Sequence, residues 1–226
     1  MLSGLSKINA ASGVRFSRWW AEQYGRYPNW CGPLEQASNY YDEMFLKQSV
    51  YHVPYTDSPD FPVWTVILER LKTYDTSSVL EIGCGVGQFA SMALDAGIAS
   101  YLGLDFSEQA IAIARNAEPR ANFVVGDARY VDVYERFSYD ALVCTEVLEH
   151  IEDDLVVIRR FPQSMRCLCS VPNFGDLAHV RYFENEEAVI GRYGVFFDSL
   201  DVIPVKVLGS ESAVLFVLDG IRSGHQ

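Results

Sequence analysis

A glycine-rich segment at residues 81–87, with the sequence EIGCGVG, constrains the fold of this 226-residue chain more than any other feature. The apolar residues before it predict a short strand, and four residues after it recur at helical spacing: Phe89, Met92, Ala93 and Ala96. Glycines between a strand and a helix allow positive φ angles. They also let a ligand lie against bare backbone, beside the unpaired N–H groups of the helix. The segment therefore predicts a ligand site at the carboxyl end of a strand.

Apolar strands and helices alternate from residue 78 onward. The predicted strands are residues 79–82, 101–104, 123–125, 141–144 and 167–171. Such alternation is typical of right-handed βαβ units, in which helices cover both faces of a parallel sheet. Two more strands, at about residues 201–208 and 213–219, have so short a connection that they predict an antiparallel hairpin. We therefore expect the α/β class: a Rossmann-like, doubly wound, mostly parallel sheet with an antiparallel edge strand.

The region before this sheet is crowded with aromatic side chains between residues 16 and 64. Its pattern predicts helices at roughly residues 14–24, 35–47 and 62–73. The chain thus divides into an N-terminal arm with a helical aromatic cap, residues 1–74, and a ligand-binding domain, residues 75–226. Because a chain of 226 residues is too short for two full domains, we expect effectively one structural domain.

The charge of the chain limits its partners. Asp and Glu number 30 against 18 Lys and Arg, which gives a net charge of −12. A field of that sign disfavours nucleic acid and anionic lipid surfaces, and no apolar run approaches the ~20 residues of a membrane span. Five cysteines form no Cys-x-x-Cys pair, and the alternation of Cys167 and Cys169 predicts small core side chains in a reducing compartment. We expect a cytoplasmic protein that does not bind membranes.

Two kinds of cofactor fit the glycine segment. Gly85-x-Gly87-x-x-Ala90 matches the dinucleotide pattern, and Asp105 lies at the expected distance for a carboxylate that binds a ribose hydroxyl. Glu81 argues against a dinucleotide, because a carboxylate two residues before the first glycine would repel a pyrophosphate. It would suit a cationic group, such as an α-ammonium or a sulfonium.

The same segment resembles motif I of the class I S-adenosylmethionine (SAM)-dependent methyltransferases. Residues 102–107 (LGLDFS) resemble the acidic second motif of that superfamily, and residues 126–128 (GDA) and 139–144 (YDALVC) resemble the third and fourth. The resemblance extends over about residues 75–220 and identifies a superfamily rather than a substrate. It implies SAM as the cofactor.

The resemblance also implies a set of cofactor-binding residues. These are Glu81, Gly83, Cys84, Gly85, Gly87, Asp105, Phe106, Asp127, Ala128 and Thr145. Glu81 and the glycines would hold the methionine part of SAM. Asp105 would bind the ribose hydroxyls, with Phe106 against the adenine. Asp127 would accept a hydrogen bond from the adenine amino group.

An acidic segment, residues 145–154 (TEVLEHIEDD), follows the fourth strand. We expect it to form a helix that continues through Ile158, with Glu146, Glu149 and His150 on the face toward the cleft. In one interpretation, the dipole of the first helical turn stabilises the acids. In the other, these three side chains and His179 bind a divalent cation such as Mg²⁺ or Mn²⁺.

The Glu-x-x-Glu-His pattern with a later histidine resembles the metal site of two groups, the small-RNA 2′-O-methyltransferases and the ubiquinone-biosynthesis O-methyltransferases. There it implies a cation that binds the accepting oxygen and lowers its pKa. The net charge disfavours the first group, and residues 161–164 (FPQS) replace the usual Pro-Gly-Gly of the second. Many relatives with Glu-His here use no metal. The catalytic set would then be His150 or His179 as general base, with Glu146.

The resemblance further implies a closed acceptor cleft, because such enzymes commonly cover it with an N-terminal cap and an insertion after the fifth strand. Here the insertion is about residues 173–197. Aromatic walls would suit a small, partly planar acceptor, or they would only pack the cap onto the sheet. The predicted acceptor contacts are Tyr24, Tyr27 and Arg181, and the alternative for Arg181 is an ion pair with Glu184.

These observations predict a SAM-dependent methyltransferase that transfers a methyl group to a hydroxyl of a small-molecule metabolite. The expected cofactors are SAM and, in the metal interpretation, Mg²⁺ or another divalent cation. Four alternatives stay open: an N-methyltransferase of a small amine, an RNA 2′-O-methyltransferase, a non-catalytic SAM-binding partner protein and a nicotinamide-dependent oxidoreductase.

Overall fold

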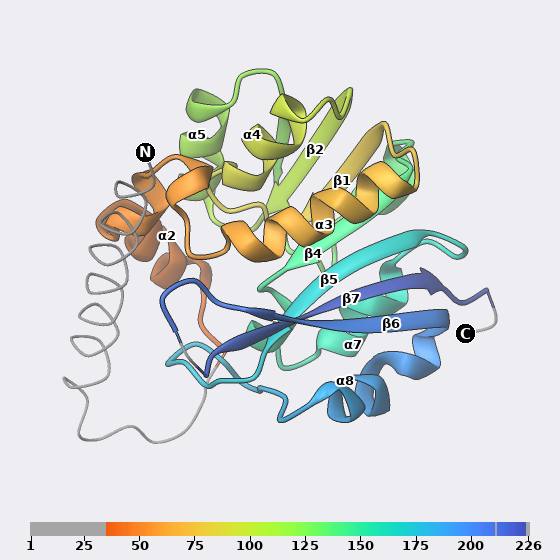
Figure 1. The fold of residues 1–226 in the computed structure, drawn as a ribbon. Coiled ribbons are helices and arrows are strands. Elements are labelled where there is room, and N and C mark those ends of the chain that lie inside the picture. The colour runs from red at the N-terminus through yellow and green to blue at the C-terminus, as the bar shows by residue number, and fades with distance from the viewer. Residues whose placement is uncertain (1–34, 211, 225–226) are drawn as a thin grey trace, which may run out of the picture.

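The fold is built on one seven-stranded sheet in the described part of the chain, which is residues 35–210 and 212–224 of a computed structural model. The strands are β1 (Ser78–Ile82), β2 (Ser100–Asp105), β3 (Asn122–Val125), β4 (Ala141–Thr145), β5 (Arg166–Pro172), β6 (Phe197–Lys206) and β7 (Val214–Arg222). Their order is β3-β2-β1-β4-β5-β7-β6 (Figure 1). The five strands from β3 to β5 are parallel, and β7 is antiparallel to both of its neighbours. The predicted α/β class is thus confirmed, with one refinement: the antiparallel strand β7 lies inside the edge strand β6.

Helices cover both faces of the sheet. They are α2 (Ser38–Lys47), α3 (Phe61–Thr73), α4 (Gln88–Asp95), α5 (Glu108–Ala117), α6 (Val133–Arg136), α7 (Asp154–Arg160) and α8 (Glu186–Tyr193). Short 3₁₀ turns are η1 (Ser49–His52), η2 (Tyr55–Asp57), η3 (Leu148–His150) and η4 (Gly194–Phe196). Buried side chains of α3, α4 and α5 share one core with the sheet, and those of α6, α7 and α8 share another. The result is a three-layer doubly wound domain.

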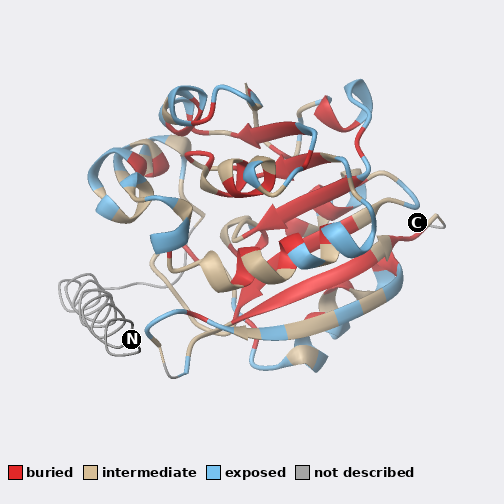
Figure 2. Cartoon of the chain, turned by 45° about the horizontal axis from the view of Figure 1, so that its top comes forward, coloured by how far each residue is buried: buried red, intermediate tan, exposed pale blue. Residues whose placement is uncertain are grey.

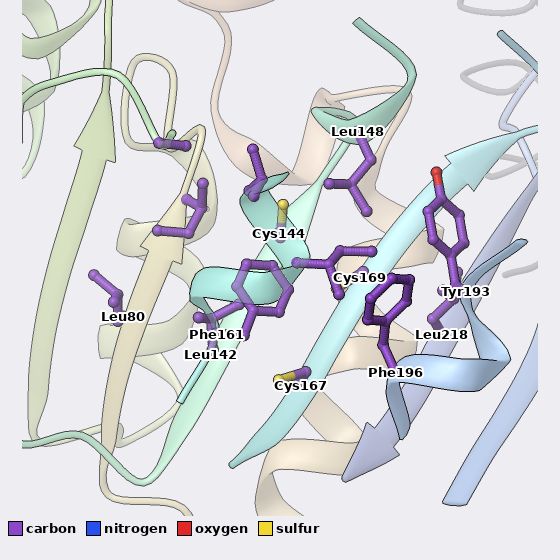
Figure 3. Close-up of a cluster of buried hydrophobic side chains, with 14 of the residues drawn as sticks. Leu80, Leu142, Cys144, Leu148, Phe161, Cys167, Cys169, Tyr193, Phe196 and Leu218 are labelled. Atoms are coloured by element: carbon purple, nitrogen blue, oxygen red, sulfur yellow. The ribbon is translucent and has the colours of Figure 1, made fainter. Parts of the chain in front are cut away.

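Alternation along the strands decides which core each side chain enters. Leu80 and Leu142 pack toward α7, whereas Val79 and Val143 pack toward α3. Because both faces are covered, the central strands are buried almost throughout (Figure 2). Figure 3 shows the core on the α7 side, where Cys167 and Cys169 lie among large apolar side chains. Both thiols are buried and free, as the sequence predicts.

Helix α2 packs against α5 (Figure 1). Ser107 caps α5 by accepting a hydrogen bond from the Ala110 backbone N–H at 3.0 Å, and its hydroxyl donates to Asp42 of α2 at 2.6 Å. The predicted helices at 35–47 and 62–73 correspond to α2 and α3. The predicted helix at 14–24 lies outside the described residues.

The expected helix from residue 145 through Ile158 is wrong. After β4, Glu146 takes a left-handed φ of 54°, η3 makes a single turn, and α7 begins only at Asp154. The guanidinium of Arg181 explains the break, because it donates hydrogen bonds to the carbonyls of residues 148, 151 and 152. A continuous helix would use these carbonyls for its own hydrogen bonds. Glu146 and Glu149 therefore do not lie in the first turn of an α-helix, and a helix dipole does not stabilise them.

Candidate active site at the carboxyl ends of the strands

A cleft of about 970 Å³ opens at the carboxyl ends of β1, β2 and β4. The strand order reverses between β1 and β4, which is where open α/β sheets bind their ligands. Side chains of α2, the turn before α4 and the segment after β5 also line this cleft. In the described part of the chain, no helix is both long and apolar enough to cross a bilayer.

The turn between β1 and α4 forms one wall of the cleft. Its glycines Gly83, Gly85 and Gly87 have φ angles of 73°, 50° and 82°. These left-handed conformations strain any residue with a Cβ atom, which explains the glycines in the sequence. The Gly85 N–H donates to the Asp105 carboxylate at 2.9 Å, so the turn is tied to the end of β2. Gly83 and Gly85 line the cleft, whereas Gly87 lies behind it at the start of α4.

Two buried carboxyl groups stand beside this turn. Glu81 is 2% exposed and accepts a hydrogen bond from the Tyr101 hydroxyl. Burial raises the pKa of Glu81 to about 8, although the Tyr101 bond lowers it. Asp105 accepts the backbone N–H groups of Ser107 and Gly85, and burial still raises its pKa to about 6. Both side chains line the cleft, where a cationic ligand would favour their ionised forms.

At the end of β3, Asp127 and Ala128 line the cleft as the second and third residues of the GDA motif. Asp127 is paired with Arg129 at 2.6 Å, and Arg129 also meets Glu35 at 2.8 Å. Burial alone would raise the pKa of Asp127, but the hydrogen bonds from Arg129 outweigh it and hold that pKa below its usual value. No sequence motif indicates Arg129 or Glu35, because only the fold brings the residue before α2 to this loop.

The loop after β4 carries two acids of different surroundings. The Glu146 carboxylate accepts a hydrogen bond from the Ser170 hydroxyl at 2.9 Å, and the Glu146 backbone N–H donates to the oxygen of that hydroxyl. Glu149 is fully buried, and its carboxylate forms no well-aligned hydrogen bond with a described residue, although it contacts the carboxyl group of Glu146. Burial raises the pKa of both groups, and the charge of Glu149 raises that of Glu146 further.

His150 and His179 meet edge to face with their ring centroids 4.7 Å apart. The Nδ1 atoms face the carbonyl oxygens of Ala178 and Phe174, each at 3.0 Å. A carbonyl accepts only, so each Nδ1 carries the proton and each Nε2 keeps a lone pair. Burial, and for His150 also the neighbouring imidazole, lowers the pKa of both rings, to about 3 for His150.

Glu149, His150 and His179 each offer a ligand atom within 4.8 Å of the others. A buried carboxyl group and two imidazoles whose Nε2 atoms keep a lone pair suit a divalent cation. Glu146, the fourth residue of the predicted metal set, is not part of this group, but its carboxyl group contacts that of Glu149 as well as the Ser170 hydroxyl.

Most predicted cofactor residues line the one cleft. They are Glu81, Gly83, Cys84, Gly85, Asp105, Phe106, Asp127, Ala128 and Thr145, and the lining also includes Glu146, His150 and His179. Of the predicted acceptor contacts, Tyr24 and Tyr27 lie outside the described residues. Arg181 does not line the cleft: its guanidinium binds three backbone carbonyls and lies 3.2 Å from Asp154. The expected pairing of Arg181 with Glu184 is therefore wrong, and its contacts are those of a structural side chain.

Only part of the predicted insertion at residues 173–197 borders the cleft. Phe174 and residues 176–179 line it, whereas α8 packs on β6 at the far end of the sheet (Figure 1). Tyr41 of α2 and Gln48, which directly follows that helix, line the cleft as well. Burial and the charge of Glu149 raise the pKa of the Tyr41 phenol far above its usual range. No sequence motif pointed to these two residues, because their position depends on how α2 docks.

Comparisons with known proteins match this architecture. A family model described as a methyltransferase domain matches residues 80–166. A ubiquinone biosynthesis O-methyltransferase of Aliivibrio fischeri is 31% identical over 97 residues, which are 41% of this chain and 41% of that protein. The match thus spans about two fifths of the length of that curated relative.

Two solved structures share the fold. The magnesium protoporphyrin IX methyltransferase from Synechocystis with bound SAM has a TM-score of 0.61 at 16% identity, over 82% of this chain and 97% of that chain. The N-methyltransferase NodS from Bradyrhizobium japonicum in complex with S-adenosylhomocysteine also has a TM-score of 0.61, at 17% identity, over 84% of this chain and 100% of that chain. At these identities the likeness concerns the fold alone.

The doubly wound sheet, the glycine turn at the strand-order reversal and the matched domain together define a class I SAM-dependent methyltransferase fold. Residues 80–166 match the methyltransferase domain, and the described sheet has the fold of solved methyltransferases.

Proposed function

We propose that this protein transfers a methyl group from SAM to a hydroxyl group of a small-molecule metabolite. One observation carries the proposal: a single cleft is bordered by the glycine turn with Glu81 and by the imidazoles of His150 and His179. The first group suits a cationic cofactor, and the second suits the activation of a hydroxyl. A methyl donor and an acceptor would therefore meet in one cavity, where positioning supplies much of the catalysis.

The cofactor half of the proposal depends on buried acids. Bound SAM supplies a methyl group on a positively charged sulfur. Glu81 would bind the α-ammonium of its methionine part, and Asp105 would bind the ribose hydroxyls with Phe106 beside the adenine. Asp127, which is paired with Arg129, would accept a hydrogen bond from the adenine amino group. Thr145 and the backbone of Cys84 complete this half of the lining.

The acceptor half depends on the imidazoles. A general base works best with a pKa near the working pH, and a ring with a pKa of about 3 is a weak proton acceptor. The unprotonated Nε2 atoms are well suited to ligate a cation with Glu149. We therefore assign Glu149, His150 and His179 to a Mg²⁺ or Mn²⁺ site, with Glu146 beside it. Such an ion would lower the pKa of a coordinated hydroxyl.

The test is a screen of hydroxylated metabolites, phenols and catechols among them, with tritiated SAM. Transfer of label to oxygen, lost when a chelator is added and restored by Mg²⁺ or Mn²⁺, is the expected result. Label transfer that the chelator leaves unchanged would overturn the cation site. Binding of NADH in place of S-adenosylhomocysteine would overturn the cofactor assignment.

A second candidate is N-methylation of a small amine, and the acidity of the cleft favours it. The lining acids are Glu35, Asp57, Asp60, Glu81, Asp105, Asp127, Glu146 and Asp176. Arg129 is the only Arg or Lys among the described residues that line the cleft, and Asp127 and Glu35 already pair with it. Such a surface attracts an ammonium group. The same screen with primary and secondary amines separates the two candidates, because the label then appears on nitrogen.

A further inference from the structure

Polar atoms without hydrogen-bond partners gather at the cleft. Within residues 35–210 and 212–224, the buried side-chain atoms that lack a partner belong to Tyr41, Gln48, Glu149 and Arg160. Tyr41 and Gln48 line the cleft, and a carboxylate oxygen of Glu149 lies 3.9 Å from Nε2 of the lining residue His150. Native proteins pair most of their buried polar groups. Several unpaired atoms around one cavity therefore point to a ligand that supplies the partners.

Tyr41 occupies the central place among these groups. Its side chain is 8% exposed, and its hydroxyl oxygen is buried without a partner in the described residues. The ring centroid lies 5.1 Å from that of Phe106 and 5.8 Å from that of His150. Phe106 belongs to the proposed cofactor half of the cleft and His150 to the acceptor half. The Tyr41 ring thus stands where the two ligands would meet.

We propose that Tyr41 binds the methyl acceptor by donating a hydrogen bond from its phenol to an oxygen of the acceptor. This inference rests on the proposed function and adds an acceptor-binding residue to it. A phenol is a donor that no described residue satisfies, and an acceptor oxygen has the lone pair to receive it. Contacts with two rings hold the side chain in place before the ligand arrives, so little freedom is lost on binding.

The unpaired hydroxyl has a consequence for stability that separates this role from a structural one. Burying a donor without a partner destabilises the folded protein. Tyr41→Phe removes that donor and keeps the ring, so it is expected to leave the melting temperature of the free protein unchanged or to raise it. Tyr139→Phe is the matched control. The Tyr139 hydroxyl is also buried, but it donates to the Tyr134 carbonyl at 3.2 Å and lies outside the cleft.

The experiment compares wild type, Tyr41→Phe and Tyr139→Phe in the full chain. Each protein is incubated with tritiated SAM and serial dilutions of a deproteinised extract from the cells that naturally make this protein. The label transferred to small molecules of the extract is measured. At low extract concentration the rate is proportional to kcat/KM, so the ratio between variants does not require the identity of the acceptor. Affinity for S-adenosylhomocysteine is measured by calorimetry, and the melting temperature is measured without ligand.

We expect Tyr41→Phe to lower the rate at low extract about 10-fold or more, with affinity for S-adenosylhomocysteine within about twofold of wild type. Tyr139→Phe should keep the rate and lose thermal stability. An unchanged rate in Tyr41→Phe overturns the inference. So does an equal loss of S-adenosylhomocysteine affinity, because the phenol would then serve the cofactor. If wild type itself transfers no label, the proposed function fails and this inference fails with it.

Discussion

Burial changes how the acids of the cleft ionise. Glu81 has a pKa of about 8 and Asp105 of about 6, whereas exposed carboxyl groups lose their proton near pH 4. At neutral pH, Glu81 is therefore mostly protonated while the cleft lacks a cation. An approaching ammonium would favour the carboxylate, so binding of the methionine part of SAM would release a proton.

The affinity for S-adenosylhomocysteine should rise between pH 6 and pH 8. The reason is that Glu81 must lose its proton to pair with the ammonium, and its pKa lies at the upper end of that range. Glu81→Gln should lower the affinity about 10-fold or more and flatten this pH dependence. Calorimetry at several pH values measures both effects. Glu69→Gln, at an exposed position on α3, is the control that should change neither. Equal affinities for wild type and Glu81→Gln at every pH would contradict the role of Glu81.

The proposed cation site also makes a prediction for single residues. Mn²⁺ should bind the protein at neutral pH, because both imidazoles are unprotonated there and a bound cation would favour the ionised form of the buried Glu149 carboxyl group. Glu149→Gln should weaken Mn²⁺ binding about 10-fold or more. Electron paramagnetic resonance of free Mn²⁺ gives the affinity without an activity assay. Glu152→Gln, at an exposed position three residues on, should bind like wild type. Absence of binding to wild type at millimolar Mn²⁺ would exclude the site.

Asp154 connects two elements of the site, the loop after β4 that carries His150 and the segment after β5 that carries His179. It is fully buried at the start of α7 and accepts hydrogen bonds from Arg192 and from the Tyr193 hydroxyl of α8. It also lies 3.2 Å from Arg181. Arg181 in turn binds the carbonyls after Glu149, and the Val180 N–H donates to the Glu149 carbonyl at 2.8 Å. The loop after β4 and the segment after β5 are thus fixed to each other.

Asp154→Asn should lower the free energy of unfolding by about 2–4 kcal/mol, because it leaves two guanidinium groups without their buried carboxylate. It should also weaken Mn²⁺ binding, since the two histidine-bearing segments lose a common anchor. Urea unfolding and Mn²⁺ titration measure the two effects. Asp201→Asn on the exposed side of β6 is the matched substitution and should change stability by less than about 0.5 kcal/mol. Equal stability of the two variants would show that the Asp154 contacts contribute little.

The elements differ in how well the sequence predicts them. The strands and α2 to α5 follow from local patterns: apolar runs, the glycine turn and the Ser107 cap. The segment after Thr145 does not, since its apolar spacing suits a helix but Arg181, more than 25 residues further along the chain, takes the carbonyls a helix would need. Long-range polar contacts of this kind cannot be predicted from the spacing of apolar residues along the sequence.

The residues of the site also differ in how well the sequence predicts their positions. The glycine turn, Glu81 and Asp105 lie at strand ends, so sequence motifs could place them at the cleft. Helical spacing, which the chain does not adopt here, places Glu146 with the predicted metal ligands, and in the structure its carboxyl group contacts both Ser170 and Glu149. Tyr41 could not be placed at the cleft from the sequence, because its position depends on the packing of α2 against Phe106 and His150.

For the whole molecule, the buried acids determine how stability depends on pH. The folded protein holds a proton on Glu81 up to a pKa of about 8, whereas the unfolded chain loses it near 4.5. Between these values the folded state binds more protons, so the free energy of unfolding should fall as pH rises. Urea unfolding of the ligand-free protein at pH 5.5 and pH 8 should show a loss on the order of a few kcal/mol. Glu81→Gln should reduce that loss, and a rise in stability over this interval would contradict the assigned burial.

A crystal structure of the complex with S-adenosylhomocysteine tests the proposed cofactor site. We predict the amino group of the ligand at Glu81, its ribose at Asp105, and its sulfur in the cleft between the glycine turn and Tyr41. Density for the ligand at any other place on the molecule, or none after soaking at millimolar concentration, would contradict the account.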